Sequence, residues 1–194
     1  MAQVLAHEIR NPLSNINLSN SFLKEELKNE TTKEYLEIIE NNSKKINQIV
    51  TDFLNQTKRP QLFLEKKSIH SILNQSIELC KDRLLLAGVK LEKSLGKDVS
   101  ILADYKKLPL VFSNIILNGI DAQKDMKESR IIIESEIIDD KVIICISDKG
   151  VGMSRATVDN LFEPFFTKKN KGMGIGMVAV DNIVTQHNGY IKID

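Results

Sequence analysis

A histidine with a carboxylate beside it lies near the start of the 194-residue chain, in the segment His7-Glu8-Ile9-Arg10-Asn11-Pro12. A neutral imidazole is a good nucleophile near pH 7, and an adjacent carboxylate can orient it and accept its second proton. Asn11 follows one helical turn later, on the same face of a predicted helix. A lone exposed histidine is usually an ordinary surface residue. Its neighbours Glu8 and Asn11 make His7 a candidate phosphate acceptor instead.

Three polar residues share one face of an otherwise apolar helix, which we predict from about Tyr105 to Lys124. Asn114, Asn118 and Asp121 are spaced by four and then three residues, which places them on one stripe. Buried polar groups need partners, so nearby loops could satisfy these amides in a purely structural way. The functional interpretation is that their oxygens bind Mg²⁺ and phosphate, because Mg²⁺ prefers few protein oxygens together with water and nucleotide phosphates.

Glycine-rich loops occur twice after this helix. The first, Asp148-Lys-Gly-Val-Gly-Met153, follows a predicted strand, and its carboxylate could accept a hydrogen bond from the amino group of a purine. The second, Gly172-Met-Gly-Ile-Gly-Met177, opens the last predicted helix, where free N–H groups and the helix dipole favour phosphate. A glycine pattern alone is weak evidence and often marks only a tight turn. The candidate nucleotide-binding glycines are Gly150, Gly152, Gly172, Gly174 and Gly176.

An aromatic and then basic segment, Phe162-Glu-Pro-Phe-Phe-Thr-Lys-Lys169, lies between the two loops. It could be a small hydrophobic plug with a solvated tail. The polar stretch Thr167–Lys171 instead suits a mobile lid over phosphates. We therefore add Phe166, Thr167 and Lys168 to the candidate nucleotide-binding residues.

The N-terminal part of the chain is predicted to form a helical hairpin. Its first helix has an apolar seam with Asn20 in one position, and a polar turn around 28–32 separates it from the second helix. Such a hairpin has little to bury its seams against, so two copies side by side would form a dimeric four-helix bundle. Docking of the hairpin on the C-terminal part of the same chain is the alternative. The seams are Leu5, Ile9, Leu13, Ile16, Leu23 and Leu27, and then Tyr35, Ile39, Asn42, Ile46, Ile49 and Phe53.

Beyond Lys58-Arg59-Pro60 the hydrophobic periodicity changes, which predicts a domain boundary. We predict an α+β chain with a helical domain over 1–57, a linker over 58–61 and an α/β sandwich over 62–194. The expected strands are Gln61–Lys67, Val89–Leu95, Val99–Ala103, Arg130–Ile138, Lys141–Asp148 and Tyr190–Ile193. The other expected helices are one capped by Ser68 that runs to Ala87 and ends at Gly88, and one from about Ile175 to His187.

Together these segments resemble the motifs of a bacterial sensor histidine kinase, in that family's order and over essentially the whole chain. His7–Leu13 is similar to the phosphoacceptor box and Asn114–Ala122 to the asparagine box. The glycine boxes and the phenylalanine box are matched by Asp148–Met153, Gly172–Gly176 and Phe162–Phe166. The usual pattern differs at Gly119, Met173, Ile175 and Met177.

The resemblance implies a dimeric phosphoacceptor hairpin and an ATP-binding sandwich of the type shared with gyrase and Hsp90 chaperones. It implies that His7 is phosphorylated with Glu8 as the base, and that an aspartate of a response regulator then receives the phosphoryl group. It also implies that Asn118 holds Mg²⁺ with Asn114 nearby and that Asp148 reads adenine. Asn11 would position the water that removes phosphate from the regulator.

Composition narrows the alternatives. The 27 basic and 26 acidic residues nearly cancel, so no nucleic-acid binding is expected. Cys80 and Cys145 are expected to be reduced core thiols. No segment could span a membrane, so we expect a cytoplasmic chain without membrane contact, or the cytoplasmic part of a membrane-anchored sensor. The chain is expected to be a piece of a longer protein. A gyrase- or chaperone-like ATPase and a degenerate nucleotide-binding scaffold remain the alternatives.

Overall fold

The computed structural model describes residues 2–26, 30–57, 62–124, 126–164, 166–169 and 174–194. The chain separates into two compact units, Met1–Pro60 and Gln61–Asp194, and each is described by itself. The predicted linker, residues 58–61, lies outside the described residues. So do several side chains within the first two helices, including those of His7 and Glu8.

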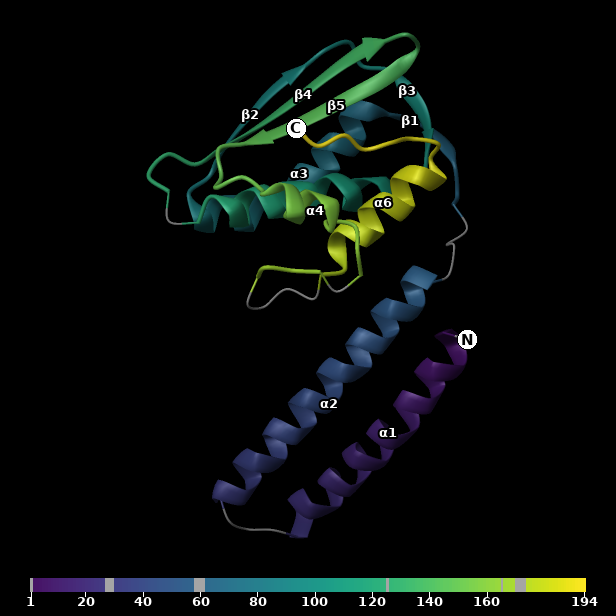
Figure 1. Cartoon of the computed structure of the whole chain (residues 1–194), viewed down its shortest axis with the longest axis vertical. Helices are drawn as coiled ribbons and strands as arrows, with labels where there is room; N and C mark the ends of the chain where they lie inside the picture. The colour runs from purple at the N-terminus through teal and green to yellow at the C-terminus, as the bar shows by residue number, and fades with distance from the viewer. Residues whose placement is uncertain (1, 27–29, 58–61, 125, 165, 170–173) are drawn as a thin grey trace. The chain divides into compact units, whose positions relative to one another are not determined.

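The first unit is a helical hairpin. Helix α1 (Ala2–Glu26) and helix α2 (Glu30–Thr57) run antiparallel, side by side (Figure 1). Leu13 and Leu36 are buried between them, and the amide Nδ2 of Asn20 donates a hydrogen bond to the carbonyl oxygen of Leu36 at 2.7 Å. These contacts confirm the predicted pairing of two helices joined by a short turn.

The predicted seam of α2 does not face α1. Tyr35, Ile39 and Ile46 have exposed fractions of 64%, 42% and 42% in the single hairpin, whereas Leu36 and Ser43 are buried against α1. The stripe that packs within the hairpin is thus displaced by one position from the predicted seam. A stretch of apolar surface on α2 is therefore still uncovered in one copy of the chain.

A charged contact also joins the two helices. The Lys24 ammonium lies 2.5 Å from the Glu40 carboxylate, and Lys44 lies 2.6 Å from the other oxygen of that group. Hydrogen bonds from Lys24 and then Lys44 lower the pKa of Glu40 to about 2, so this carboxylate is ionised at neutral pH. Such solvent-exposed pairs contribute little stability but help to fix the register of the two helices.

The second unit is an α/β sandwich, as predicted. The strands are β1 (Glu65–Ser68), β2 (Lys90–Leu95), β3 (Ser100–Ala103), β4 (Arg130–Ile138) and β5 (Lys141–Asp148). The helices are α3 (Ile69–Ala87), α4 (Leu108–Ala122), α5 (Arg155–Asp159) and α6 (Gly176–Gln186). Strand β2 pairs parallel with β4, β4 pairs antiparallel with β5, and β1 pairs antiparallel with β3 in a separate two-stranded sheet. Helices α3, α4 and α6 lie on one side of the larger sheet (Figure 1).

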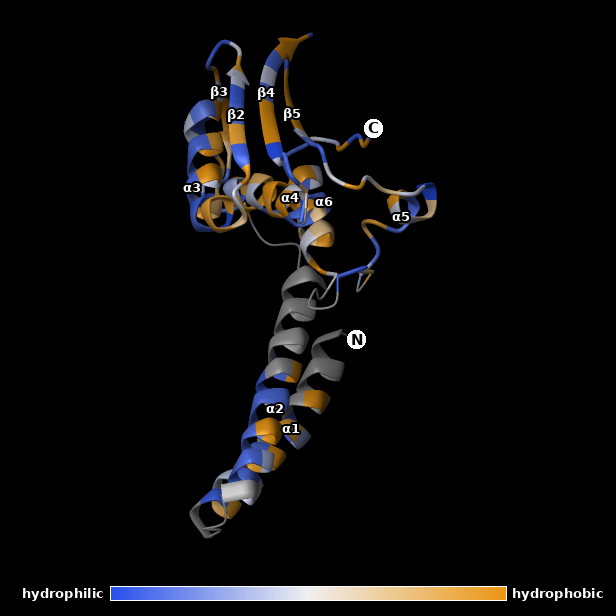
Figure 2. Cartoon of the chain, turned by 90° about the vertical axis from the view of Figure 1, so that its left-hand side faces the viewer, coloured by the Kyte–Doolittle hydropathy of each residue, from blue (hydrophilic) through white to orange (hydrophobic). Residues whose placement is uncertain are grey.

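The core lies between the sheet and these helices. Ile131 and Ile133 of β4 are fully buried against apolar side chains of α3 and α4, and a second cluster joins α4 to α6 through Val111 and Val180. The colouring by hydropathy shows the same apolar character in α4, β4 and β5 (Figure 2). Helix α4 is therefore buried on most of its surface, which makes its polar stripe conspicuous.

Several element bounds differ from the predictions. Helix α4 begins at Leu108 rather than near Tyr105 because the Asp104 carboxylate accepts hydrogen bonds from the N–H groups of Lys106 and Lys107 in a preceding turn. Strand β1 is shorter than predicted. The predicted strand Tyr190–Ile193 forms no ladder with another described strand, and a short strand needs a partner edge to be stable.

The two cysteines differ in their surroundings. Cys80 is buried, and burial raises the pKa of its thiol to about 11. Cys145 is exposed, so the prediction that both are core thiols is wrong for Cys145. The reason is its place on β5, where alternate residues point away from the sheet face that α3, α4 and α6 cover. Among the helices that the structure describes, none is both long and apolar enough to cross a membrane.

Candidate functional site

Helix α4 carries the polar residues around which the candidate site is formed. Val111, Ile116 and Ile120 are buried and fix its orientation in the core. The polar stripe, Asn114, Asn118 and Asp121, is only half-buried. Asn114 turns its amide Nδ2 back to its own helix, where it donates to the carbonyl oxygen of Leu110 at 2.9 Å. Asn118 and Asp121 direct their oxygens outward instead.

A lysine ammonium group occupies the space in front of these two oxygens. Lys169 Nζ lies 2.7 Å from Asn118 Oδ1 and 2.7 Å from Asp121 Oδ2. The two contacts join residues 51 and 48 positions apart in the sequence. An amide oxygen and a carboxylate oxygen thus converge on one cation, which is the donor set that Mg²⁺ also prefers.

The Asp121 carboxylate has a second cationic partner. The Nη2 atom of Arg83, a residue of α3, lies 2.6 Å from Asp121 Oδ1. Asp121 is therefore shared between a guanidinium from α3 and an ammonium from the segment that follows α5. Charge-assisted hydrogen bonds of this kind hold the carboxylate in one orientation on the helix.

The first glycine loop is joined directly to the end of α4. The N–H group of Gly150 donates to Asp148 Oδ1 at 2.7 Å, and the N–H group of Val151 donates to the carbonyl oxygen of Ala122 at 3.2 Å. Asp148 ends β5 and packs on α4 at Gly119, where a Cβ atom would lie 3.3 Å from Asp148 Cβ. The small residue at position 119 therefore lets the Asp148 carboxylate approach the helix.

Replacement of Gly150 by alanine is expected to destabilise this part of the fold. A Cβ atom there would lie 2.6 Å from Ala122 Cβ and 2.6 Å from Asp148 Oδ1. Such overpacking costs about 1–3 kcal/mol. Thermal unfolding of Gly150→Ala should show a lower midpoint than Gly152→Ala, the matched control. Gly152 has a φ of +69°, but a Cβ atom added there would meet no described atom within 4 Å, so only backbone strain applies. Equal midpoints for the two variants would contradict this packing.

The second glycine loop reaches the other end of the stripe. Gly174 has a φ of +67°, a conformation that favours glycine. Helix α6 begins at Gly176, and a Cβ atom there would lie 3.1 Å from Asn114 Oδ1. The N-terminus of α6, with its free N–H groups, therefore faces Asn114. Gly172 lies outside the described residues.

The two lysines of the segment after α5 contact different helices. Lys168 Nζ donates to Thr157 Oγ1 of α5 at 2.5 Å, whereas Lys169 reaches α4. Thr167 is exposed and accepts a hydrogen bond from the N–H group of Lys169 at 3.0 Å. Phe166 is half-buried, and its N–H group donates to the Glu163 carbonyl oxygen at 3.2 Å. A direct role of Lys168 in nucleotide binding stays a prediction.

The candidate acceptor residues lie in the other unit. His7, Glu8 and Asn11 belong to α1. Asn11 is exposed, which agrees with the predicted outward face, while the side chains of His7 and Glu8 lie outside the described residues.

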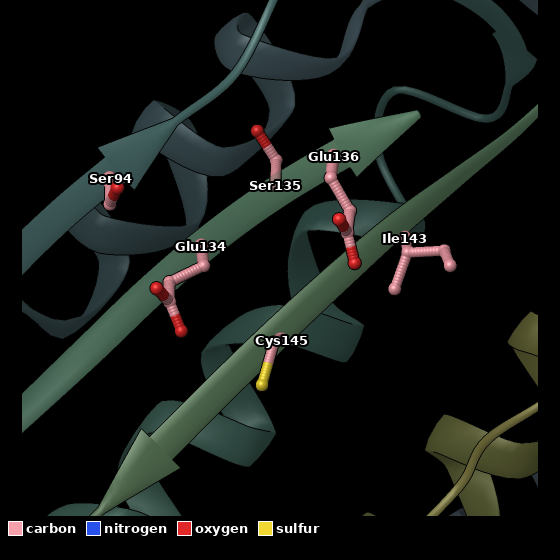
Figure 3. Close-up of a pocket in the computed structure, with 6 residues that line it drawn as sticks. All are labelled: Ser94, Glu134, Ser135, Glu136, Ile143 and Cys145. Atoms are coloured by element: carbon pink, nitrogen blue, oxygen red, sulfur yellow. The ribbon is translucent and has the colours of Figure 1, made fainter. Parts of the chain in front are cut away.

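Two hollows in the second unit overlap the polar stripe only at Asp121. One, of about 350 Å³, lies on β2, β4 and β5 and is lined by Ser94, Glu134, Ser135, Glu136, Ile143 and Cys145 (Figure 3). It contains none of the candidate residues. Another, of about 320 Å³, includes Arg83 and Asp121 but otherwise continues along the end of α3 toward Met126. Among the described residues, the candidate site is thus recognised by its converging polar groups and by its glycines.

The residues present fit a nucleotide with a divalent cation. The Lys169 ammonium shows that Asn118 Oδ1 is directed to a position where a cation can lie. Gly150 and Gly176 have no side chain at positions where a Cβ atom would contact Ala122 and Asn114, respectively. Asn118 would be the protein ligand of the metal, with phosphates and water completing its coordination.

Two residues of this constellation were not among the predicted site residues. Lys169 was indistinguishable from Lys168 by sequence, because both follow Thr167 in a segment without periodicity. Arg83 lies on α3, outside every motif, and only the packing of α3 against α4 brings it to Asp121. No signal in the sequence marked it.

Two family models match the chain in the order of its units. Residues 1–61 match the His Kinase A (phospho-acceptor) domain. Residues 103–194 match the model described as Histidine kinase-, DNA gyrase B-, and HSP90-like ATPase. The first match contains His7, and the second contains α4 and both glycine loops.

Known proteins are similar over the same span. Sporulation kinase D of Bacillus subtilis (strain 168) is 32% identical over all of this chain, which covers 38% of that protein. Full-length ShkA in complex with AMPPNP has a TM-score of 0.69 at 21% identity, over 95% of this chain and 40% of that one. Histidine kinase ThkA in complex with the response regulator protein TrrA has a TM-score of 0.62 at 25% identity, over 97% and 55%. The chain spans less than half the length of the curated relatives that it matches.

Proposed function

Because the chain belongs to the bacterial sensor histidine kinases, we propose that it transfers the γ-phosphoryl group of ATP to His7 and then to an aspartate of a response regulator. The observation that carries this proposal is the convergence of Asn118 and Asp121 on one cation. This convergence occurs on a helix that contacts both glycine loops.

In the proposed nucleotide site, Asp148 accepts a hydrogen bond from the adenine amino group. Its carboxylate is held for this by the N–H group of Gly150. The N-terminus of α6 binds phosphate oxygens through its free N–H groups. Asn118, with Asn114 one turn away, holds Mg²⁺, which offsets negative charge on the phosphates when bound.

In the proposed reaction, one ring nitrogen of His7 attacks the γ-phosphorus as the bond to the β-phosphate oxygen breaks, and ADP leaves. Glu8 accepts the proton from the other ring nitrogen, so that no positive charge remains on the phosphorylated ring. An aspartate of the regulator then attacks the same phosphorus, and His7 leaves. In a separate phosphatase reaction, Asn11 orients the water that attacks the regulator's acyl phosphate, which releases inorganic phosphate and the aspartate carboxylate.

We propose that the chain acts as a homodimer through the uncovered face of its hairpin. Exposed apolar side chains gather on both helices, and a second copy would bury them. They are Ile16, Leu18, Phe22, Leu23, Tyr35, Ile38, Ile39 and Ile46.

Replacement of Ile46 by aspartate is expected to dissociate the dimer, since it would place an unpaired charge in an apolar interface. Sedimentation of the unaltered chain should give a dimer and Ile46→Asp a monomer or a dimer at least roughly tenfold weaker, equivalent to about 1.4 kcal/mol. Leu85→Asp is the matched control because Leu85 is 80% exposed in the other unit. An unaltered chain that sediments as a monomer would contradict the proposed assembly.

Incubation with ATP labelled on its γ-phosphate tests the proposed function against its alternatives. A kinase incorporates label into the chain. An ATPase of the gyrase or chaperone type releases labelled phosphate without labelling the chain, and a nucleotide-binding scaffold does neither. Only the first outcome supports the proposal.

A further inference from the structure

Four side chains form a continuous polar chain across the candidate site. Arg83 contacts Asp121, Asp121 contacts Lys169, and Lys169 contacts Asn118, with separations of 2.6, 2.7 and 2.7 Å. Two of these residues are cations from different elements that share one carboxylate. The amide oxygen at the end of this chain is the atom that the proposed function assigns to Mg²⁺.

One oxygen cannot serve an ammonium group and a divalent cation together. Lys169 Nζ and Mg²⁺ would both lie within coordination distance of Asn118 Oδ1, and their like charges repel at such a separation. Mg²⁺ can therefore bind Asn118 only after Lys169 has left it. The side chains of Lys169 and Asp121 are 44% and 32% exposed, so their ion pair is weak enough to exchange.

The local anchoring allows this exchange without movement of an element. The Lys168 ammonium group donates to the Thr157 hydroxyl of α5 and not to α4, so a rotamer change of Lys169 alone can withdraw the ammonium group that lies on Asn118. Arg83 contacts the other carboxylate oxygen, Oδ1, so its contact does not depend on Lys169 and Asp121 can keep a cationic partner when Lys169 leaves.

We propose that Lys169 is a built-in competitor of Mg²⁺ for Asn118, and that Arg83 is a positioning residue that weakens the hold of Asp121 on Lys169. The inference rests on the proposed function. Without nucleotide, Lys169 occupies Asn118 Oδ1. Mg²⁺ with nucleotide displaces it, and the affinity for the metal complex is lowered by the fraction of molecules in which Lys169 occupies that oxygen.

Calorimetric titration of the full chain with ADP, in the presence of Mg²⁺ and in the presence of a chelator, separates this competition from ordinary phosphate binding. Lys169→Met should bind Mg·ADP about two- to fivefold more tightly, the range expected when a weak exposed ion pair is removed. Arg83→Met should bind Mg·ADP about two- to fivefold more weakly. Asp121 then no longer shares its charge with Arg83, so it holds Lys169 more firmly beside Asn118. Neither change should strengthen the binding of metal-free ADP.

The double variant gives the sharpest test. If Arg83 acts through Lys169, the loss caused by Arg83→Met should disappear in the Lys169→Met background. Lys81→Met is the matched control, since Lys81 is another exposed lysine in an ion pair, with Glu78 of the same helix α3. It should change neither affinity, and unfolding midpoints should show that all variants are folded.

The competing explanations give different results. Weaker binding of both Mg·ADP and metal-free ADP by Lys169→Met would show a simple phosphate contact and would overturn the inference. Equal losses from Arg83→Met with and without Lys169 would overturn the role of Arg83. If the unaltered chain bound no adenine nucleotide, the proposed function and this inference would both be wrong. Nucleotide binding without these metal-dependent changes would overturn the inference alone.

Discussion

Replacement of His7 by glutamine is expected to abolish labelling of the chain by ATP while leaving nucleotide affinity unchanged. Glutamine can hydrogen-bond but has no ring nitrogen to attack the γ-phosphorus. The residues proposed to hold the nucleotide belong to the other compact unit, Gln61–Asp194. Label incorporation and calorimetry on the same preparation measure the two properties separately.

Glu8→Gln is the companion variant, because it keeps the acceptor and removes the proposed base. Labelling should slow by roughly 10²–10⁴-fold, the usual loss for a general base, yet still reach the same final extent. Label on His7→Gln would exclude His7 as the acceptor. An unchanged rate for Glu8→Gln would exclude Glu8 as the base.

Asn118→Ala is expected to have the second large effect, with loss of both Mg·ATP affinity and labelling. Its amide oxygen is the atom already directed at a cation, Lys169 Nζ, at 2.7 Å. Removal of a group that supports a metal site commonly costs about 10–100-fold. The affinity for metal-free ADP should change much less, since its contacts would lie on the glycine loops and Asp148.

Asn74→Ala is the matched control for this variant. Asn74 is an exposed asparagine of α3, and its Oδ1 also accepts a hydrogen bond from a lysine ammonium, that of Lys93. It should bind Mg·ATP as the unaltered chain does. If Asn118→Ala retained full affinity and full labelling, the assignment of this stripe to the metal would be wrong.

Elements whose ends are marked by capping or turn residues were predicted well. Helix α3 has Ser68 as its N-cap and Gly88, with a φ of +64°, as its C-cap, and both ends lie where the sequence places them. Strands β4 and β5 also have the predicted bounds. Their turn residues, Asp139 and Asp140, adopt positive φ values, which aspartate tolerates better than most residues.

Features that depend on tertiary contacts were not predictable in the same way. The predicted seam of α2 consists mainly of apolar residues that share one stripe, but the stripe that packs on α1 includes Ser43 and the backbone carbonyl of Leu36. Hydrophobic periodicity does not detect a buried serine or a carbonyl group that accepts a hydrogen bond. The choice between Lys168 and Lys169 likewise depends on where α5 and α4 lie around an irregular segment. The stripe on α4 was predictable because three polar residues on an apolar helix need partners.

The chemical stability and position of the bound label test the central claim most directly. The account predicts a phosphoryl group on nitrogen, which acid removes and alkali leaves in place, and which peptide mapping under alkaline conditions locates on His7. Label that survives acid, or that maps to a residue other than His7, would contradict it.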